Sequence, residues 1–412
     1  MTAPESAPAS DWATLAISSV AHSYSHLFIL LYATVVLVLE GSFGGMTYAD
    51  LQWLSLPGFV LYGVAALPAG LLGDRWSATG MMAVFFIGVG LSSILTGLAS
   101  GPVGLLIGLA AIGLFSSIYH PVGIAWLVKH AVNRGRALGI NGVFGNLGTG
   151  AAAILAGALA DTFGWRVAFI VPGTIALITG LVFLWAVRKG WVVEMEADAK
   201  TIPAAPAADV RRVFFAMAVT VICVGLIFQT TSVGLPKIFS DRLGGAGATA
   251  MGAGILVSIV YFIAAGSQII GGELADRYPL KRVYFVSQLV QVPIVLIAFY
   301  TFNIGLVGLA ILMVGLNVGG QPAENALLAR YTPLAWRGRI YGLKFVATLG
   351  VATLGVALIP AIWDWTGSLD ALLLFIAAFA LASTVAAALL PTDKDSVLAG
   401  RARTRAAAGE GD

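Results

Sequence analysis

Three histidines lie inside long apolar stretches of the sequence, where an ionisable side chain is costly unless it faces a partner or a polar cavity. His22 and His26 are four residues apart, which places them on one face of a helix, and Ser116 lies one turn before His120 in a later stretch. An imidazole, with a reference pKa of about 6.5, binds and releases protons in the physiological range. These residue types at this spacing predict a proton-responsive site.

A second polar stripe shares one helical face further along the chain and consists of Asn317, Gln321 and Glu324. Both stripes run into a proline, Pro121 or Pro322, which frees backbone carbonyls and commonly bends a helix. With a rise of about 1.5 Å per residue, His26 and His120 both lie about 13 Å from the same membrane surface. We therefore expect these two histidines to meet in one layer, with His22 as a relay toward that surface.

The same histidines permit other interpretations. Imidazoles at i and i+4, a third from another helix and Glu324 form a competent ligand set for a transition metal ion, so metal binding by His22, His26 and His120 is an alternative. A histidine in a membrane helix can also simply hydrogen-bond a neighbouring helix. The single cysteine, Cys223, excludes an internal disulfide and a cysteine-based metal site. We predict no bound cofactor.

The sequence predicts one further pair of charges inside the membrane. Glu324 and Lys344 each lie about 8 Å from the end of an apolar run, judged from the helical rise per residue. Because an unpaired charge is costly at that depth, we predict that they form an intramembrane ion pair. In the rival interpretation, Glu324 is free in a cavity as a proton carrier and Lys344 extends to the surface.

The elements that must position these residues are membrane helices. The composition is 59% hydrophobic and 10% charged with a mean hydropathy of +0.92, which is too little polar surface for a soluble globule. Runs of about 20 apolar residues are each long enough to cross a bilayer as a helix. We predict twelve spans, and thus an all-α integral membrane protein, at 17–39, 51–72, 79–99, 102–128, 137–160, 167–187, 212–235, 250–271, 282–302, 304–328, 339–362 and 369–390.

The chain is an internal duplication. Gly70-Leu-Leu-Gly-Asp74-Arg75 returns as Gly272-Glu-Leu-Ala-Asp276-Arg277, and Arg-Gly-Arg follows in both copies at an offset of about 200 residues. The Gly-x-x-x-Asp-Arg loop resembles the signature of the major facilitator superfamily of transporters. This resemblance implies two pseudo-symmetric six-helix halves. We expect them at 1–187 and 212–412, each with a cytoplasmic tail, joined by a polar, proline-bearing cytoplasmic linker at 188–211.

The resemblance also implies how the parts work. In the family, helices one, four, seven and ten line a central cavity, and the signature loops, here Asp74, Arg75, Asp276 and Arg277, close the cytoplasmic side. Asp74 should then lie against the helix that begins near Arg339, and Asp276 near Arg136. The segment from Arg134 to Gly148 weakly resembles the fosmidomycin-resistance-type permeases. The fifth span lacks the Gly-Pro of the drug-antiporter motif, so a standard drug-antiporter mechanism is not expected.

Charge distribution sets the expected orientation. Of the 23 Lys and Arg residues, all but Arg166, Lys237, Arg242 and Lys344 fall on the side of the N-terminus, which predicts that both termini are cytoplasmic. We expect a monomeric, proton-coupled secondary transporter of the bacterial inner membrane that moves a small organic compound, preferably outward. Its partners are that substrate, protons and the bilayer, and not nucleic acid. Alternatives are a transition-metal or metal-chelate transporter and a non-transporting membrane scaffold or sensor; no enzyme motif is present.

Overall fold

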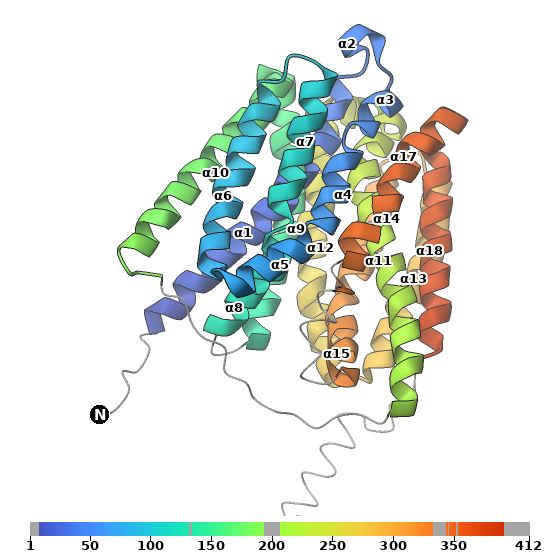
Figure 1. Cartoon of the computed structure of the whole chain (residues 1–412). Coiled ribbons are helices and arrows are strands. Elements are labelled where there is room, and N and C mark those ends of the chain that lie inside the picture. Colours follow the sequence, from blue (N-terminus) through green and yellow to red (C-terminus); the bar gives the residue numbers. More distant parts are fainter. Residues whose placement is uncertain are drawn as a thin grey trace, which may run out of the picture.

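The twelve predicted membrane helices are present. The computed structural model describes residues 8–131, 134–192, 207–332, 343–344, 346–351 and 353–390, and the side chains at 8–11, 134–136 and 207–212 are outside this description. Every regular element in these residues is helical, and twelve helical spans are long and apolar enough to cross a membrane. The predicted all-α membrane fold is therefore confirmed (Figure 1).

The first six spans occupy the chain up to Arg188. Short elements between or at the ends of spans are η1 (Val36–Val38) and α2 (Ser42–Gly45). The spans are built from α1 (Pro8–Val35); α3 (Tyr48–Trp53), α4 (Leu56–Val64) and α5 (Ala66–Arg75); α6 (Ala78–Gly97); α7 (Pro102–Ser116), η2 (Tyr119–Gly123) and α8 (Ile124–His130); α9 (Arg134–Phe163); and α10 (Trp165–Arg188).

The last six spans lie between Ala207 and Ala388. The helix α11 begins at Ala207, inside the predicted linker, because the alanines there extend the helix, and η3 (Gly244–Ala246) follows it. The spans are built from α11 (Ala207–Arg242); α12 (Ala250–Arg277); α13 (Leu280–Phe299); α14 (Gly305–Gly319) and α15 (Gln321–Tyr331); η4 (Val346–Val351) and α17 (Thr353–Thr366); and α18 (Asp370–Ala388).

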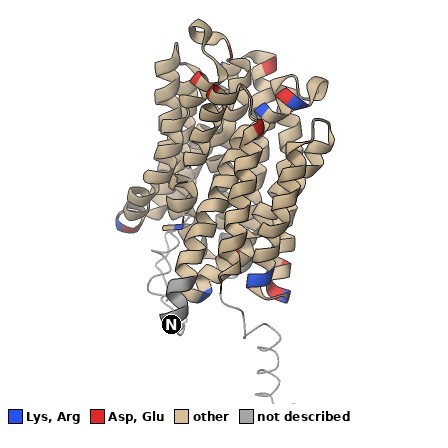
Figure 2. Cartoon of the chain, turned by 90° about the vertical axis from the view of Figure 1, so that its right-hand side faces the viewer, with Lys and Arg blue, Asp and Glu red and all other residues tan. Residues whose placement is uncertain are grey.

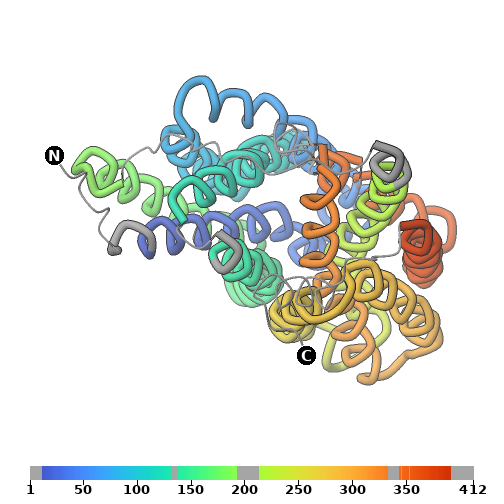
Figure 3. The backbone as a smooth tube through the Cα atoms, turned by 90° about the horizontal axis from the view of Figure 1, so that it is seen from below, coloured from blue at the N-terminus to red at the C-terminus, as the bar shows by residue number. Residues whose placement is uncertain are grey.

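The two halves lie side by side as upright bundles. In Figures 1 and 3 the blue-to-green helices α1 to α10 form one group and the yellow-green-to-red helices α11 to α18 the other, with α9 and α12 adjacent between them. We call the end at which α1 begins the lower end and the opposite end, where α2 and α3 lie, the upper end. Figure 2 shows the charged residues gathered at both ends and a middle layer of other residue types, as expected for a bilayer-spanning bundle.

Close backbone approaches hold the halves together. On α9 and α12, a Cβ added to Gly157 would lie 2.2 Å from the Ala250 oxygen, so only glycine permits this packing. Between α4 and η4, a Cβ on Gly63 would lie 2.1 Å from the Cα of Gly350. The Thr353 hydroxyl also donates to the Phe59 oxygen at 3.1 Å. These contacts lie from the middle of the bundle to its upper end.

The fourth span changes its winding where the chemistry is. Pro121 has no N–H to donate, and the helix accommodates it as a wide π-turn, η2, between α7 and α8. Single π-turns inside helices are frequent at functional sites. Here the turn carries both Tyr119 and His120, which are buried.

Candidate functional site

The three membrane histidines form one cluster. The ring centroids of His22 and His26 are 5.1 Å apart, and each lies 5.3 Å from the centroid of His120. Each ring offers a nitrogen that lies within 4.8 Å of the nitrogens offered by the other two. His22 and His120 are buried and His26 is half-buried. The structure thus brings together all three histidines that the sequence singled out.

Local backbone geometry creates this meeting. One helical turn of α1 places His22 and His26 on the same face, and η2 turns His120 toward them. On α9, a Cβ at Gly145 would lie 2.7 Å from two atoms of the His22 ring, so glycine makes room for that imidazole. His22 contacts the rings of both His26 and His120 directly, and its role as a relay stays a prediction.

A hydrogen-bonded network fixes His22 from behind. Its Nδ1 donates to the backbone oxygen of Asn141 on α9 at 2.7 Å, and its ring stacks on Tyr119 at 4.9 Å. The Tyr119 hydroxyl donates to the Asn141 side-chain oxygen at 2.9 Å, and the Asn141 amide donates to the Ser18 hydroxyl at 3.2 Å. With Nδ1 committed as a donor, the Nε2 atom of His22 carries the lone pair.

A second chain of hydroxyls leads away from His120. Its Nδ1 lies 3.3 Å from the Tyr62 hydroxyl on α4, which in turn lies 3.1 Å from the Ser25 hydroxyl. The Ser25 hydroxyl donates to the backbone oxygen of Ser116 at 3.3 Å. One consistent assignment has each group donating to the next, from the imidazole to Tyr62, to Ser25 and to the carbonyl. The predicted site residue Ser116 therefore contributes through its backbone.

An aromatic contact joins the cluster to the second half of the chain. The Phe228 ring of α11 approaches His26 with a centroid distance of 5.8 Å. Phe228 also lines a narrow pocket, without room for a water molecule in this conformation, whose other lining residues are Ile227, Thr231, Tyr261, Met313, Val314 and Asn317. In this pocket the Thr231 hydroxyl and the Asn317 side-chain oxygen are buried without a hydrogen-bond partner. Of the second polar stripe, Asn317 is thus the member that lines this pocket with Phe228.

The other members of that stripe interact elsewhere. Gln321 accepts from the Gln268 amide of α12 at 3.2 Å. Glu324, with 1% of its side chain exposed, lies 2.6 Å from the Lys344 ammonium and accepts from the Tyr284 hydroxyl at 2.7 Å. The predicted partners Glu324 and Lys344 are therefore in contact, and their carboxylate and ammonium groups satisfy each other within the second half. A metal ligand set that includes Glu324 is not formed, because this pairing occupies the carboxylate.

The signature-loop residues lie at the lower end. Asp74 and Arg75 close α5, Asp276 and Arg277 close α12, and all four are exposed. Arg277 pairs with Glu273 one turn before it on the same helix. The partners expected for the two aspartates, the helix start near Arg339 and the side chain of Arg136, lie outside the described residues.

The upper end is closed by a lysine that links the two halves. Lys237 of α11, whose side chain is 10% exposed, lies 3.6 Å from Glu40 of the first half and 3.0 Å from Asp241. Its ammonium also lies over the rings of Tyr48 and Trp363, at 5.3 and 4.4 Å from their centroids. Charge pairing and cation–π attraction act at the same atom, so Lys237 holds the upper ends of the halves together.

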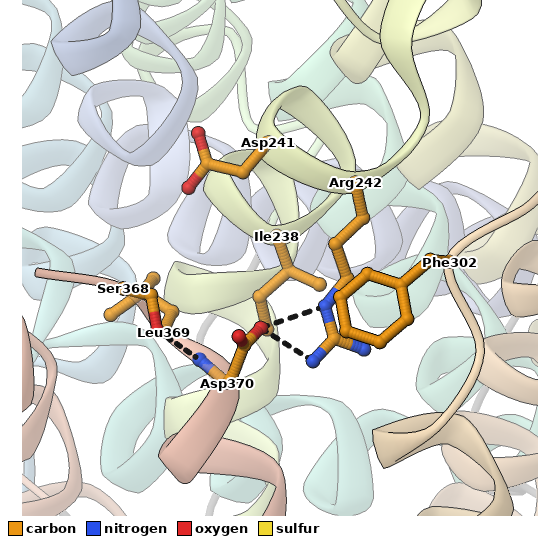
Figure 4. Close-up of a pocket in the computed structure, with 7 residues that line it drawn as sticks. All are labelled: Ile238, Asp241, Arg242, Phe302, Ser368, Leu369 and Asp370. Atoms are coloured by element: carbon orange, nitrogen blue, oxygen red, sulfur yellow. Dashed lines mark hydrogen bonds and ion pairs between the residues drawn. The ribbon is translucent and has the colours of Figure 1, made fainter. Parts of the chain in front are cut away.

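Beside this closure, Arg242 ties three helices of the second half. Figure 4 shows its guanidinium between Asp370 and the Phe302 ring, at the edge of a pocket of about 120 Å³. The guanidinium donates to Asp370 at 2.9 and 2.5 Å and to the Ala298 oxygen at 2.9 Å. Because these bonds fix the end of α11 to the starts and ends of its neighbours, Arg242 has a structural role.

Sequence reasoning did not find the residues that orient the histidines. Ser18 and Ser25 lie on α1 within a turn of the two histidines, so the helical spacing would have found them had the stripe been drawn wider. Tyr62 and Asn141 belong to other helices, and Phe228 to the other half. Nothing in their own segments distinguishes them from packing residues.

The chain is similar to membrane transport proteins over its whole length. The sequence profile of the Major Facilitator Superfamily matches residues 16–343 and 217–408. The chain is 26% identical over 166 residues to the puromycin resistance protein of Streptomyces alboniger, and this matched segment covers 37% of this chain and 33% of the relative. It is 30% identical over 147 residues to the tetracenomycin C resistance and export protein of Streptomyces glaucescens, 34% of this chain and 27% of the relative.

A membrane sensor protein, UhpC of Salmonella typhimurium, is also similar, with 27% identity over 149 residues, 35% of this chain and 33% of the relative. The matched segments thus span about a third of these curated relatives. Among solved structures, a bacterial homolog of the human lysosomal transporter Spinster, inward-facing and occupied, superposes with a TM-score of 0.71 at 16% identity, over 94% of this chain and 97% of that one. A peptide transporter gives 0.69 at 15% identity, over 92% and 93%.

Proposed function

The chain belongs to the Major Facilitator Superfamily of membrane transporters, and on that basis we propose that it exports a small organic compound across the bacterial inner membrane in exchange for protons. The observation that carries the proposal is the cluster of three imidazoles, packed in contact with the opposite half through His26 and Phe228. Membership supports a transporter, and the relatives in Streptomyces that confer antibiotic resistance favour export.

Protons and substrate compete at the cluster. The rings of His22, His26 and His120 lie about 5 Å apart, so a proton on one disfavours a proton on the others by charge repulsion. The hydroxyl chain through Tyr62 and Ser25 is suited to hold His120 in one tautomer while the site loads and releases a proton. Substrate that contacts the neutral rings would then be displaced by protonation, which couples the two movements.

Alternating access supplies the movement across the membrane. The upper end is joined through Lys237, Glu40, Tyr48 and Trp363, and the closest backbone approaches lie between the middle and that end. We place the lower end, which carries the termini and the signature loops, in the cytoplasm, because Lys and Arg gather there. In this orientation the structure has its periplasmic side closed, and opening requires that the Lys237 contacts break while the halves rock.

Transport by everted membrane vesicles tests the proposal. With an imposed pH gradient and a panel of labelled compounds, wild-type vesicles should accumulate a compound that empty-vector vesicles do not. His26→Gln and His120→Gln should abolish accumulation driven by the gradient and retain counterflow, and His22→Gln should slow transport without uncoupling it. His130→Gln is the matched control, because His130 lies on α8 and bonds to the Trp126 oxygen.

Two results would contradict the proposal. Normal gradient-driven transport by both His26→Gln and His120→Gln, with wild-type pH dependence, would show that the histidines are packing residues. A protein that binds compounds from the panel but moves none of them would instead fit the sensor alternative.

A further inference from the structure

We propose that His22, His26 and His120 form a binding site for a divalent late first-row transition metal ion such as Zn²⁺, Co²⁺ or Ni²⁺. Among the described residues they are the one group of three or more His, Cys, Asp or Glu side chains whose ligand atoms converge. Imidazole nitrogens are preferred ligands of these ions. The inference concerns binding alone, so it is independent of the compound carried and of the direction of transport.

The spacing of the nitrogens suits such an ion. In a tetrahedral site with metal–nitrogen bonds of about 2.0–2.1 Å, ligand nitrogens lie about 3.4 Å apart. The nitrogens of the cluster already lie within 4.8 Å of one another. Each ring therefore needs to move toward the centre by no more than about 1 Å. We expect rotations of these side chains, which lie on one turn of α1 and on the π-turn η2, to supply this movement.

The atoms behind the rings orient them as metal ligands. A metal-bound histidine nearly always donates its other ring N–H to a carbonyl, carboxylate or similar acceptor, which fixes the ligand nitrogen. His22 does so through Nδ1, which donates to the Asn141 oxygen at 2.7 Å, so Nε2 is its ligand atom. His120 has Nδ1 within 3.3 Å of the Tyr62 hydroxyl, and the hydroxyl chain that follows allows Nδ1–H to donate there. Two of the three ligands thus have the arrangement of a metal site around them.

Charge defines what completes the site. Three neutral imidazoles leave both positive charges of the ion uncompensated, and burying such charge in a membrane protein is costly. Glu324 does not supply the compensation, because Lys344 and Tyr284 hold its two oxygens. An anionic fourth ligand, hydroxide or a carboxylate of a small molecule, therefore stabilises the ion, and a three-histidine site keeps a coordination position for it.

Cobalt(II) titration of the full-length protein tests the site. The protein, purified with an affinity tag that contains no histidine and stripped with chelator, should bind one Co²⁺ per chain and develop the visible d–d absorption of a four-coordinate centre. Equimolar Zn²⁺ should displace it. His26→Gln and His120→Gln should lose the absorption, and Tyr62→Phe should weaken binding by about 10-fold or more because it removes the group behind His120. His130→Gln, which alters the one histidine outside the cluster, should bind as the wild type does.

The outcomes separate this inference from the proposed function. Wild-type protein that binds no Co²⁺ at neutral pH, or that loses as much binding in His130→Gln as in His26→Gln, would overturn the metal site. The first result is measured on the wild type alone, so it does not depend on how well a variant folds. Transport assays run in the presence of chelator test the proposed function separately. A result that excludes the metal site therefore does not decide whether the protein transports, and the converse also holds.

Discussion

Replacing Lys344 by Met should lower the free energy of unfolding by about 3–5 kcal/mol, the usual loss when one partner of a buried ion pair is removed. The structure supports the upper part of this range. Glu324 is 1% exposed and Lys344 10% exposed at the side chain, with 2.6 Å between their charged atoms, so solvent screens the pair little. The Tyr284 hydroxyl, 2.7 Å from the other carboxylate oxygen, does not neutralise the charge that remains.

The double-mutant cycle isolates the interaction. Glu324→Gln leaves the ammonium buried and should also destabilise, whereas Glu324→Gln with Lys344→Met removes both charges and should be more stable than either single variant. Denaturant-induced unfolding in detergent micelles, followed by circular dichroism, gives the four free energies. Glu273→Gln is the control, because its pair with Arg277 has both side chains more than half exposed and should contribute about 0–1 kcal/mol.

Additive losses would refute this reasoning. If the double variant is destabilised by the sum of the two single effects, the charges do not stabilise each other. Glu324 would then be free to act as the proton carrier of the rival interpretation. In that case pH-gradient-driven transport should fail in Glu324→Gln and persist in Lys344→Met.

Three further changes test how the halves move, each read from the reactivity of cysteine probes placed at the upper and lower ends in a Cys223→Ser background. Lys237→Met removes the ion pair that spans the halves, and should raise upper-end reactivity about fivefold, the equivalent of about 1 kcal/mol; unchanged reactivity would show that the aromatic contacts suffice. Gly63→Ala places a Cβ 2.1 Å from the Gly350 Cα. It should destabilise the closed upper end by about 1–3 kcal/mol and so raise the reactivity of the upper-end probes. Gly350→Ala, with its nearest contact at 3.6 Å, should have little effect, and equal effects would exclude steric control. Asp74→Asn should shift the equilibrium toward an open lower end by up to about 1 kcal/mol without unfolding, which raises the reactivity of the lower-end probes. Unaltered reactivity would count against a gating role.

The sequence predicted the spans, their number and the three histidines because these follow from local pattern. Apolar runs have the length that the bilayer requires, and the i, i+4 spacing of His22 and His26 fixes their common face. That His26 and His120 meet was predictable from the helical rise, since both sit at the same depth. The same depth argument paired Glu324 with Lys344, and the structure places their charged atoms in contact.

What the sequence did not predict depends on rotation of one helix against another. Depth along a helix does not say which way Gln321 points, and the structure turns it to Gln268 of α12. The depth estimate placed His22 nearer the membrane surface than His26 and His120, and it did not predict that His22 contacts both rings. The π-turn at η2 shifts His120 so that it touches both His22 and His26. Tyr62 and Asn141 gain their roles from tertiary packing alone.

The distribution of charge between the halves explains how the centre can separate at small energetic cost. All three histidines belong to the first half, and the buried pair of Glu324 and Lys344 belongs entirely to the second. Between them lies the edge contact of His26 with Phe228, and such aromatic contacts are worth about 0.5–1.5 kcal/mol. Among the described residues, rocking therefore breaks no buried ion pair at the centre. In the part of the chain that the structure describes, the ion pair across the halves is that of the shielded Lys237 with the more exposed Glu40 at the upper end, so the barrier to opening should depend on that end more than on the occupant of the site.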